Sequence, residues 1–383
     1  MKYKLGEICE IISGSTPKTG IPEYWDGTQK WITPAELNED TYIITDSIRK
    51  LTELGVEKAG LSSFPEGTVI LSSRAPIGKV AIAGCEMYCN QGFKNLICSE
   101  KINNHYLYWF LKGRTEYLNS LGRGATFKEI SKQIVSNIEI DVPPIEQQKR
   151  AVNQLEKANA IIRLRKQQLQ KLDELVKARF VEMFGDVIRN SKSWEIRVLA
   201  DIASSRLGKM LDTKQQTGEC SYPYLANFNV QWFRFNTENL NQMDFNEEDR
   251  IEFELQNGDL LICEGGEIGR CAVWHNEIQP CFFQKALHRV RCNRQIVHPD
   301  YLGWWFKYNC DHDGFAAIAG AKATIAHLPG VKLKQLRVAI PPLELQEQFA
   351  AFVEQANKSK VTVQKALDEA QLLFDSLMQK YFG

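Results

Sequence analysis

Two pairs of adjacent prolines are the residues most suggestive of catalysis, because an adenine methyltransferase carries Asn, Asp or Ser, then Pro-Pro, then an aromatic residue. The pairs stand at positions 143–144 and 341–342, and they read Val-Pro-Pro-Ile and Ile-Pro-Pro-Leu. Neither pair has a polar residue before it or an aromatic residue after it. We therefore predict that the chain transfers no methyl groups by itself.

Three other stretches begin like functional motifs and then depart from them. The stretch 77–80, "IGKV", lacks the first glycine of a phosphate-binding loop and the Ser or Thr after its lysine. "HPDYLGWWFK" lacks the acid-x-Lys that follows a nuclease Pro-Asp, so we interpret Asp300 as a helix N-cap. "DFNEED" has Asp249 where a calcium loop requires glycine. We expect no catalytic residues and no cofactor bound by this chain.

The ten cysteines do not have the spacing of a metal site. None forms Cys-x-x-Cys, and Cys85 and Cys89 have no nearby histidine. Most of the others, such as Cys98, Cys263 and Cys292, lie in apolar runs, as buried thiols in a reducing compartment do. No stretch of 18 apolar residues occurs and the N-terminus does not read as a secretory leader, so we expect a cytoplasmic protein without membrane contact.

The proline pairs also mark an internal repeat. They begin the phrases "VPPIEQQKR" and "IPPLELQEQ", whose first residues, Val142 and Ile340, are 198 positions apart. Upstream, "HYLYWFLK" matches "DYLGWWFK", "GTVILSSRAPIGKVAI" matches "GDLLICEGGEIGRCAV", and "GAT" at 124–126 faces "KAT" at 322–324. The chain is therefore predicted to contain two copies of one unit of about 190 residues.

Each copy predicts a globular part followed by a long helix. "GTVILSS" and "KVAIAG" read as strands joined by the turn "RAPIG", and a helix with an apolar face follows at "HYLYWFLK". The proline pair ends the last strand, because proline cannot donate to a β-ladder, and it suits the first turn of a helix. The fold class is α/β in composition, with strands and helices mixed as in an α+β protein.

The long helices carry a heptad seam. In the first helix Leu155, Ile162, Leu169 and Val176 recur every seven residues, and in the second a seam of three- and four-residue steps holds Val353, Val363, Leu367, Phe374 and Leu377. Residues 145–190 hold ten basic and six acidic side chains, whereas residues 343–383 hold four and six. These patterns predict that the helices pair as an antiparallel coiled coil. Packing of each helix on its own globular part stays open as the alternative.

The duplicated Pro-Pro-Ile/Leu-Glu-x-Gln phrase, the GAT and KAT loops, the "DLLI" strand with its turn and the heptad helices together resemble the specificity subunit of a type I restriction–modification system. The resemblance implies two similar target-recognition domains, residues 1–144 and 186–342, each reading half of a split DNA site. It implies that residues 145–185 and 343–383 form an antiparallel coiled coil, related by pseudo-twofold repetition, which acts as spacer ruler and scaffold. Implied partners are double-stranded DNA, two methyltransferase subunits and restriction-translocase subunits, and S-adenosylmethionine, ATP and Mg would act in those subunits.

The net charge is zero, which excludes a uniformly basic nucleic-acid binder and leaves only local patches for DNA. Base reading requires Arg, Lys, Asn or Gln on protruding elements. The candidates are Lys18, Arg74, Lys79, Gln91 and Lys94 in the first copy, and Lys209, Arg270, Gln284 and Lys285 in the second. A solvated surface role is the competing interpretation for each, and the aromatic residues 304–306 are assigned to the core.

Two other functions stay open at this point. An orphan DNA-binding regulator of the same build would bind DNA tightly without partners. A protein–protein scaffold built on the coiled coil, without nucleic acid, would never show sequence-dependent binding.

Overall fold

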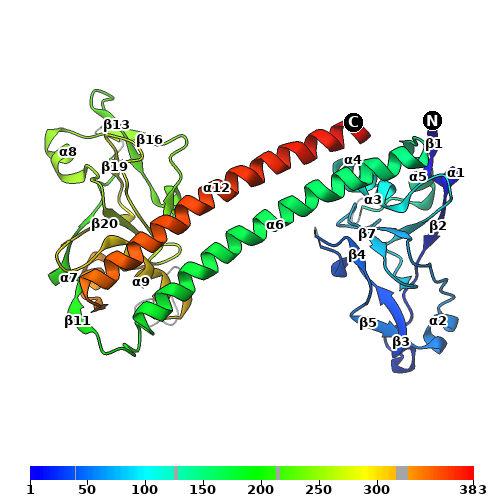
Figure 1. Cartoon of the computed structure of the whole chain (residues 1–383), viewed down its shortest axis with the longest axis horizontal. Helices are drawn as coiled ribbons and strands as arrows, with labels where there is room; N and C mark the ends of the chain where they lie inside the picture. The colour runs from blue at the N-terminus through cyan, green and yellow to red at the C-terminus, as the bar shows by residue number, and fades with distance from the viewer. Residues whose placement is uncertain (39, 125–127, 213–215, 316–326) are drawn as a thin grey trace. The chain divides into compact units, whose positions relative to one another are not determined.

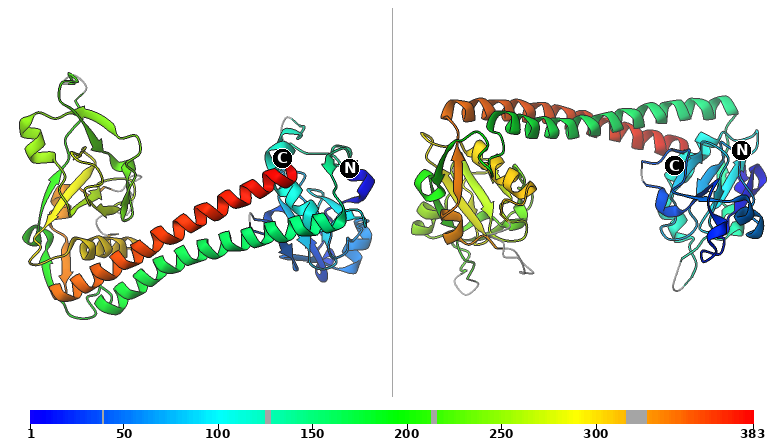
Figure 2. Two further views of the ribbon diagram at one scale, coloured as in Figure 1. Left: turned by 45° about the horizontal axis from the view of Figure 1, so that its top comes forward. Right: turned by 90° about the horizontal axis from the view of Figure 1, so that it is seen from below.

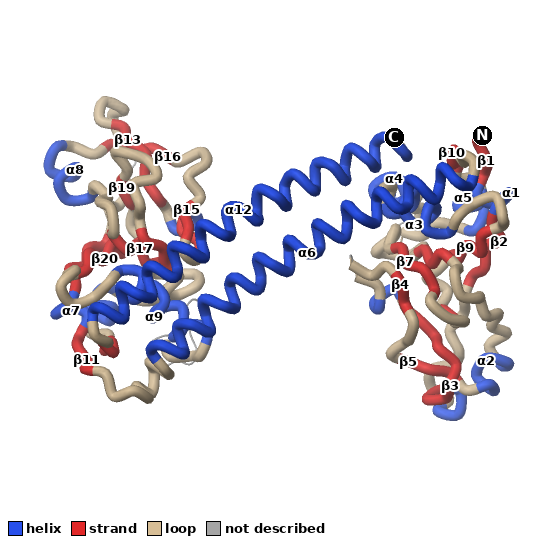
Figure 3. Tube along the Cα trace, in the orientation of Figure 1, coloured by secondary structure: helices blue, strands red, loops and turns tan. Residues whose placement is uncertain are grey.

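A computed structural model describes residues 1–38, 40–124, 128–212, 216–315 and 327–383 (Figure 1). Ala125, Thr126 and the "KAT" loop at 322–324 lie outside these ranges. The chain folds as two compact units: residues 1–166 with 365–383 form unit 1, and residues 167–364 form unit 2. Figure 3 shows that each unit mixes strands with helices, so the predicted fold class is confirmed. The bounds predicted for the recognition domains stay a prediction.

Unit 1 opens with a strand and closes its globular part with another before the first long helix. Its elements are β1 (Lys2–Lys4), α1 (Leu5–Ile8), β2 (Cys9–Ser13), η1 (Pro22–Tyr24), β3 (Trp25–Ile32), η2 (Pro34–Glu36), β4 (Ile43–Ile44), β5 (Arg49–Leu51), α2 (Glu53–Lys58), β6 (Val69–Leu71), β7 (Val80–Ala83), β8 (Tyr88–Cys89), β9 (Lys94–Cys98), α3 (Asn104–Lys112), α4 (Thr115–Ser120), α5 (Lys132–Ser136), β10 (Glu139–Asp141) and the start of α6 (Ile145–Phe184).

Unit 2 has a similar order of elements after α6. Its elements are β11 (Glu195–Val198), α7 (Leu199–Ile202), β12 (Ala203–Leu207), β13 (Ser221–Leu225), η4 (Asn227–Asn229), β14 (Val230–Gln231), β15 (Arg234–Phe235), β16 (Asn241–Asp244), α8 (Glu247–Phe253), β17 (Asp259–Cys263), β18 (Cys271–Val273), β19 (Phe282–Phe283), β20 (Leu287–Cys292), α9 (Pro299–Asp311), α11 (Gly330–Lys334), β21 (Arg337–Ile340) and the start of α12 (Leu343–Phe382). No described helix is long and apolar enough to cross a membrane.

The main sheets of the two units share their strand order up to one edge. Unit 1 has the order β2-β9-β6-β7-β4, and unit 2 has β12-β20-β17-β18. The register repeats as well, because Val69 pairs with Ile82 as Leu260 pairs with Val273. The strands predicted over "GTVILSS" and "KVAIAG" are confirmed by β6 and β7. Unit 2 therefore repeats the sheet of unit 1 without a described counterpart of β4.

A buried glutamine joins each long helix to its globular part. In unit 1 the Gln148 amide donates to the carbonyls of Lys101 (3.0 Å) and Pro143 (2.8 Å), and its oxygen accepts from the Asn103 N–H (2.8 Å). These bonds satisfy the backbone N–H of Asn103, which caps α3, and the carbonyl of Pro143, just before α6. The glutamine of the repeated phrase thus has a structural role that the sequence did not reveal.

Gln346 makes the same three bonds in unit 2. Its amide donates to Ile296 O (3.1 Å) and Pro341 O (2.7 Å), and its oxygen accepts from His298 N (2.8 Å). His298, not Asp300, is the N-cap of α9, so the interpretation of Asp300 as the cap is wrong. The N-cap lies two residues before the predicted one because Pro299 favours the first helical position.

Each unit buries the start of one long helix and the end of the other. The unit 1 core includes Leu155 of α6 together with Phe374, Leu377 and Phe382 of α12. The unit 2 core includes Phe180 and Phe184 of α6 together with Phe349 and Val353 of α12. The ring of Tyr106 lies 4.9 Å from that of Phe382, and the equivalent Tyr301 lies 4.8 Å from Phe184. Packing of each helix only on its own copy is therefore excluded.

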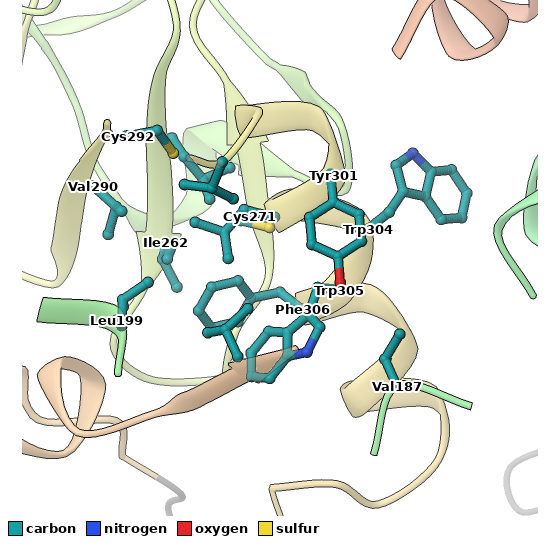
Figure 4. Close-up of a cluster of buried hydrophobic side chains, with 14 of the residues drawn as sticks. Val187, Leu199, Ile262, Cys271, Val290, Cys292, Tyr301, Trp304, Trp305 and Phe306 are labelled. Atoms are coloured by element: carbon teal, nitrogen blue, oxygen red, sulfur yellow. The ribbon is translucent and has the colours of Figure 1, made fainter. Parts of the chain in front are cut away.

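The rest of the unit 2 core is built on α9 and the sheet. Figure 4 shows Tyr301 and Phe306 of α9 beside Ile262 and Cys271 of the strands. Trp304 and Trp305 are buried in the same cluster, which confirms that residues 304–306 belong to the core.

Within unit 2 the two helices run antiparallel. Asp173 forms an ion pair with Lys360 at 2.5 Å, and the ring of Phe184, farther along α6, lies 5.4 Å from that of Phe349, earlier in α12. Figure 2 shows the helix segments side by side in each unit. Lys360, which lies between the seam residues Val353 and Val363, is thus paired with Asp173 of the other helix.

The predicted seam residues all face away from bulk solvent to some degree. Leu155, Ile162, Val176 and Val353 are buried, and Leu169, Val363, Leu367, Phe374 and Leu377 are half-buried.

We predict that Gln148→Leu lowers the free energy of unfolding of unit 1 by about 3 kcal/mol or more, because a buried polar group left without its bond costs about 1–3 kcal/mol and three are affected. Urea unfolding followed by circular dichroism would measure this. Gln147→Leu, the same change at the exposed neighbouring position, is the control and should have little effect. We call these three hydrogen bonds the glutamine clamp. Equal stability of the two variants would contradict its structural role.

Candidate nucleic-acid interface

A glycine crossing brings the polar loop after β2 against the turn that precedes β9. A Cβ on Gly14 would lie 2.0 Å from the carbonyl oxygen of Cys89, so only glycine allows this approach. The Ser15 N–H donates to Cys89 O at 3.1 Å, and the Thr16 hydroxyl donates to the side-chain oxygen of Gln91. Gln91 and, two residues beyond Thr16, Lys18 are exposed on this surface.

Unit 2 repeats the crossing with other side chains. A Cβ on Gly208 would lie 2.3 Å from the carbonyl oxygen of Gln284, and the Lys285 N–H donates to Lys209 O at 2.8 Å. The structure therefore brings three predicted residues of the second copy together: Lys209, Gln284 and Lys285. Lys285 is exposed and Gln284 is half-buried.

Two predicted cations of unit 1 share one carboxylate. Arg74 Nε lies 2.9 Å from Glu129, and the buried Lys94 Nζ lies 3.2 Å from the other Glu129 oxygen. Lys94 also donates to the Ser73 hydroxyl at 3.3 Å. Burial alone would raise the pKa of Glu129, but the hydrogen bonds from Arg74 and Lys94 outweigh it and hold that pKa below its usual range. Arg74, in the turn between β6 and β7, and Lys94, at the start of β9, are thus both held by Glu129.

Three further predicted cations are also bound within the fold. Lys79 donates to the carbonyls of Pro34 and Leu37, Lys209 pairs with Asp249, and Arg270 donates to Asn227 O at 3.1 Å and pairs with Glu267 at 3.5 Å. Asp249, the residue that broke the calcium-loop pattern, is part of the capping box of α8. Of the nine predicted residues, Arg74, Lys79, Lys94, Lys209 and Arg270 are thus engaged with protein groups, and the assignment of all nine to DNA stays a prediction.

Position 94 differs in kind between the copies. In the register of the repeat its counterpart is His288, which is buried and lies 3.1 Å from the carbonyl of Leu328. Burial lowers the pKa of His288, so this position is neutral at pH 7 where unit 1 has a buried cation. The two crossings therefore share a backbone and differ in charge.

The sequence reasoning missed two exposed cations of unit 1. Arg123 pairs with Glu129 through backbone bonds of 2.9 and 3.0 Å, and Lys128 is the next residue before Glu129. Both side chains are exposed beside Arg74 at the base of the "GAT" loop. The sequence could have pointed to them only through their position on either side of that loop.

In the described ranges, no three His, Cys, Asp or Glu side chains are placed to hold a metal ion. The cysteines are free thiols, and burial raises the pKa of several of them, to about 12 for Cys292.

Comparison with known proteins gives one family over both units. The family described as "Type I restriction modification DNA specificity domain" matches residues 1–174 and 191–370. The MjaIX specificity subunit of Methanocaldococcus jannaschii is 36% identical over 223 residues, which cover 54% of this chain and 52% of that protein. The EcoKI specificity subunit of Escherichia coli is 21% identical over 338 residues, covering 82% and 73%. The chain spans about half the length of the first of these relatives.

Two solved structures share the fold. The S subunit of a type I restriction–modification system from M. genitalium is 14% identical with a TM-score of 0.62, covering 100% of this chain and 96% of that one. A chain from a study of assembly and conformational transition of the type I R-M system is 17% identical with a TM-score of 0.61, covering 100% and 97%.

We predict that Lys94→Met lowers the free energy of unfolding by about 1–3 kcal/mol at pH 7, because it removes buried hydrogen bonds to a charged group. The deficit should shrink as the pH falls below the ordinary glutamate value of 4.5, because Glu129 has a lowered folded pKa and contributes its ion-pair stability only while ionised. Lys128→Met, on the exposed neighbour of Glu129, is the control. Equal urea midpoints for both variants at pH 7 would contradict this assignment.

Proposed function

Since this chain belongs to the type I restriction modification DNA specificity family, we propose that it is the DNA-reading subunit of such a system and that each unit reads one half of a split site. The duplication carries this proposal. The domain occurs twice, and both copies repeat the glutamine clamp, the sheet register and the glycine crossing. Paired modules suit duplex DNA, where half-sites about 34–36 Å apart, or a multiple, present the same groove.

The two crossings differ where they would touch bases. The turn that holds Asn90 and Gln91 in unit 1 holds Gln284 and Lys285 in unit 2. Amides and lysines read base edges through different donor and acceptor patterns. We assign the exposed residues Lys18 and Gln91 of unit 1 and Lys285 of unit 2 to DNA contact, with Gln284 beside Lys285, and the engaged cations to holding these loops in place.

The long helices supply the spacer in this proposal. Each of α6 and α12 has 40 residues, which corresponds to a rod of about 60 Å at a rise of ~1.5 Å per residue. Two matched helices resist bending better than a single linker of the same length. Their length would then set the number of unread base pairs between the half-sites.

We propose that the helices also hold the partner subunits. Large apolar side chains stay exposed on them in both units: Ile161, Leu164, Leu372 and Leu373 in unit 1, and Leu175, Val181 and Val361 in unit 2. Exposed apolar rows on a helix pair are suited to covering by further helices. The proposed occupants are two methyltransferase subunits, joined by restriction-translocase subunits, with S-adenosylmethionine, ATP and Mg acting there and not in this chain.

The proposed binding to DNA also indicates where in the cell the protein acts. A subunit that meets chromosomal DNA and keeps its cysteines as thiols belongs in the cytoplasm, which we propose as its location.

We predict that exchanging residues 1–144 for the same region of a relative changes one half of the methylated site and leaves the other half and the gap unchanged. Each unit has its own core, so the exchange should not disturb unit 2. Sequencing of methylated adenines, after assembly with the cognate methyltransferase, gives the result. A reciprocal exchange of residues 186–342 is the control, and a change in both halves after either exchange would contradict the proposal.

A further inference from the structure

Among the described residues, the main sheet of unit 2 ends one strand earlier than that of unit 1. In unit 1, β4 pairs in parallel with the outer edge of β7, with Ile43 opposite Ile82. In unit 2, β18 is the last strand of the sheet among the described residues. Phe233, in the turn between β14 and β15, covers part of this edge: its N–H donates to Cys271 O at 3.0 Å. Val273, the counterpart of Ile82, lies beyond that cover.

A tyrosine side chain fills the corresponding place in unit 1. Tyr42 directly precedes β4, and its carbonyl accepts from the Ile82 N–H at 2.8 Å. Its hydroxyl is bonded to His105 Nδ1 and donates to a carboxylate oxygen of Glu156. Its ring meets that of Tyr108 edge-on at 4.6 Å. The β-strand edge, the N-terminus of α3 and one face of α6 thus enclose this side chain.

The corresponding three elements of unit 2, β18, α9 and α12, enclose a cleft. Its volume is about 680 Å³, and it is lined by the end of β18 at Val273, the start of α9 at Asp300, and the face of α12 that carries Ala351 and Glu354. By the offsets of the repeat, Asp300 stands for His105 and Glu354 for Glu156. The cleft therefore lies where Tyr42 meets His105 and Glu156 in unit 1, whereas Phe233 stacks at 4.3 Å on Trp304, the counterpart of Trp109.

The groups around the cleft favour a neutral hydrogen-bond donor. Asp300 and Glu354 both offer carboxylate oxygens, but Glu354 is paired with Lys358 at 2.7 Å, and Arg294 lines the same cleft. The N–H of Asp300 donates to His298 Nδ1 at 3.3 Å, so that nitrogen offers no proton to the Asp300 carboxylate. His298 Nδ1 also lies 3.4 Å from the Asp300 carboxylate, and burial raises the pKa of Asp300. Arg294 and Lys358 already lie beside the carboxylates of Glu347 and Glu354, so a hydroxyl supplies the missing hydrogen bond to Asp300 without adding a third cation.

We propose that this cleft binds a tyrosine side chain carried by an extended segment of a partner protein. The tyrosine hydroxyl donates to the Asp300 or Glu354 carboxylate, and its carbonyl accepts from the Val273 N–H, as Tyr42 does at Ile82. Strand pairing ends there, because the His275 N–H, which replaces that of Gly84, already donates to Glu277 at 2.9 Å. The side chain therefore contributes more than the strand edge. This inference does not depend on DNA reading.

The probe is a capped peptide with the sequence of residues 40–47, DTYIITDS, which carries the tyrosine and strand that fill unit 1. We expect saturable binding of one peptide per full-length chain by titration calorimetry. Replacing the tyrosine of the peptide by Phe should weaken binding about fivefold to tenfold through loss of one hydrogen bond, and replacing it by Ala should abolish binding. Stronger binding of a peptide with Lys at that position would identify a cation site and overturn the proposal.

Protein variants locate the binding. Ala351→Trp fills the cleft from an exposed helix position and should abolish binding, whereas Ala178→Trp, at an exposed position on α6 of the same unit, should not. Glu354→Met, which removes one carboxylate acceptor with little change in volume, should weaken binding and provides a second measurement if the tryptophan variant unfolds. No saturable binding of the tyrosine peptide to the unaltered chain, or binding that survives Ala351→Trp in a folded protein, would overturn the proposal.

Discussion

The buried glutamine at the start of each long helix is the constraint on which the rest of the structure depends. Gln148 and Gln346 each bond three backbone groups: the carbonyl before the helix, a carbonyl of the preceding loop, and the N–H of the residue that caps the short helix of the globular part. Because both glutamine side chains are buried, any other direction of the helix would leave some of their polar atoms unpaired. The helix is therefore fixed to its globular part at one angle in both units.

The fixed start of each helix determines where its far end packs. Unit 1 covers the start of α6 with the end of α12, and unit 2 covers the start of α12 with the end of α6. The same aromatic pair closes both contacts, Tyr106 with Phe382 and Tyr301 with Phe184. Neither globular core is complete without the other copy's helix, which explains why the repeat occurs twice in one chain. The equal lengths of the two helices follow from the same exchange.

The sequence could predict what local pattern determines. The repeat, the strands β6 and β7, the proline-started helices and the paired seam follow from spacing and turn residues. The roles of individual polar residues could not be predicted, because they depend on partners distant in sequence. Lys94 pairs with Glu129, Lys360 with Asp173, and Lys209 with Asp249. A lysine in a loop reads the same whether it meets a phosphate or a buried carboxylate. The sequence likewise did not predict that β18 has no described neighbour like β4, because a two-residue strand leaves almost no pattern.

The central claim is that two similar readers are held apart by a helix pair of defined length, and one measurement tests it most directly. Seven residues inserted after Leu169 and seven after Leu367 keep the heptad phase and lengthen both helices by about 10 Å, close to three base pairs at roughly 3.4 Å each. Methylated sites of the assembled variant would then be mapped. The account predicts the same two half-sites separated by a longer unread gap. Methylation that persists at the original spacing would contradict it.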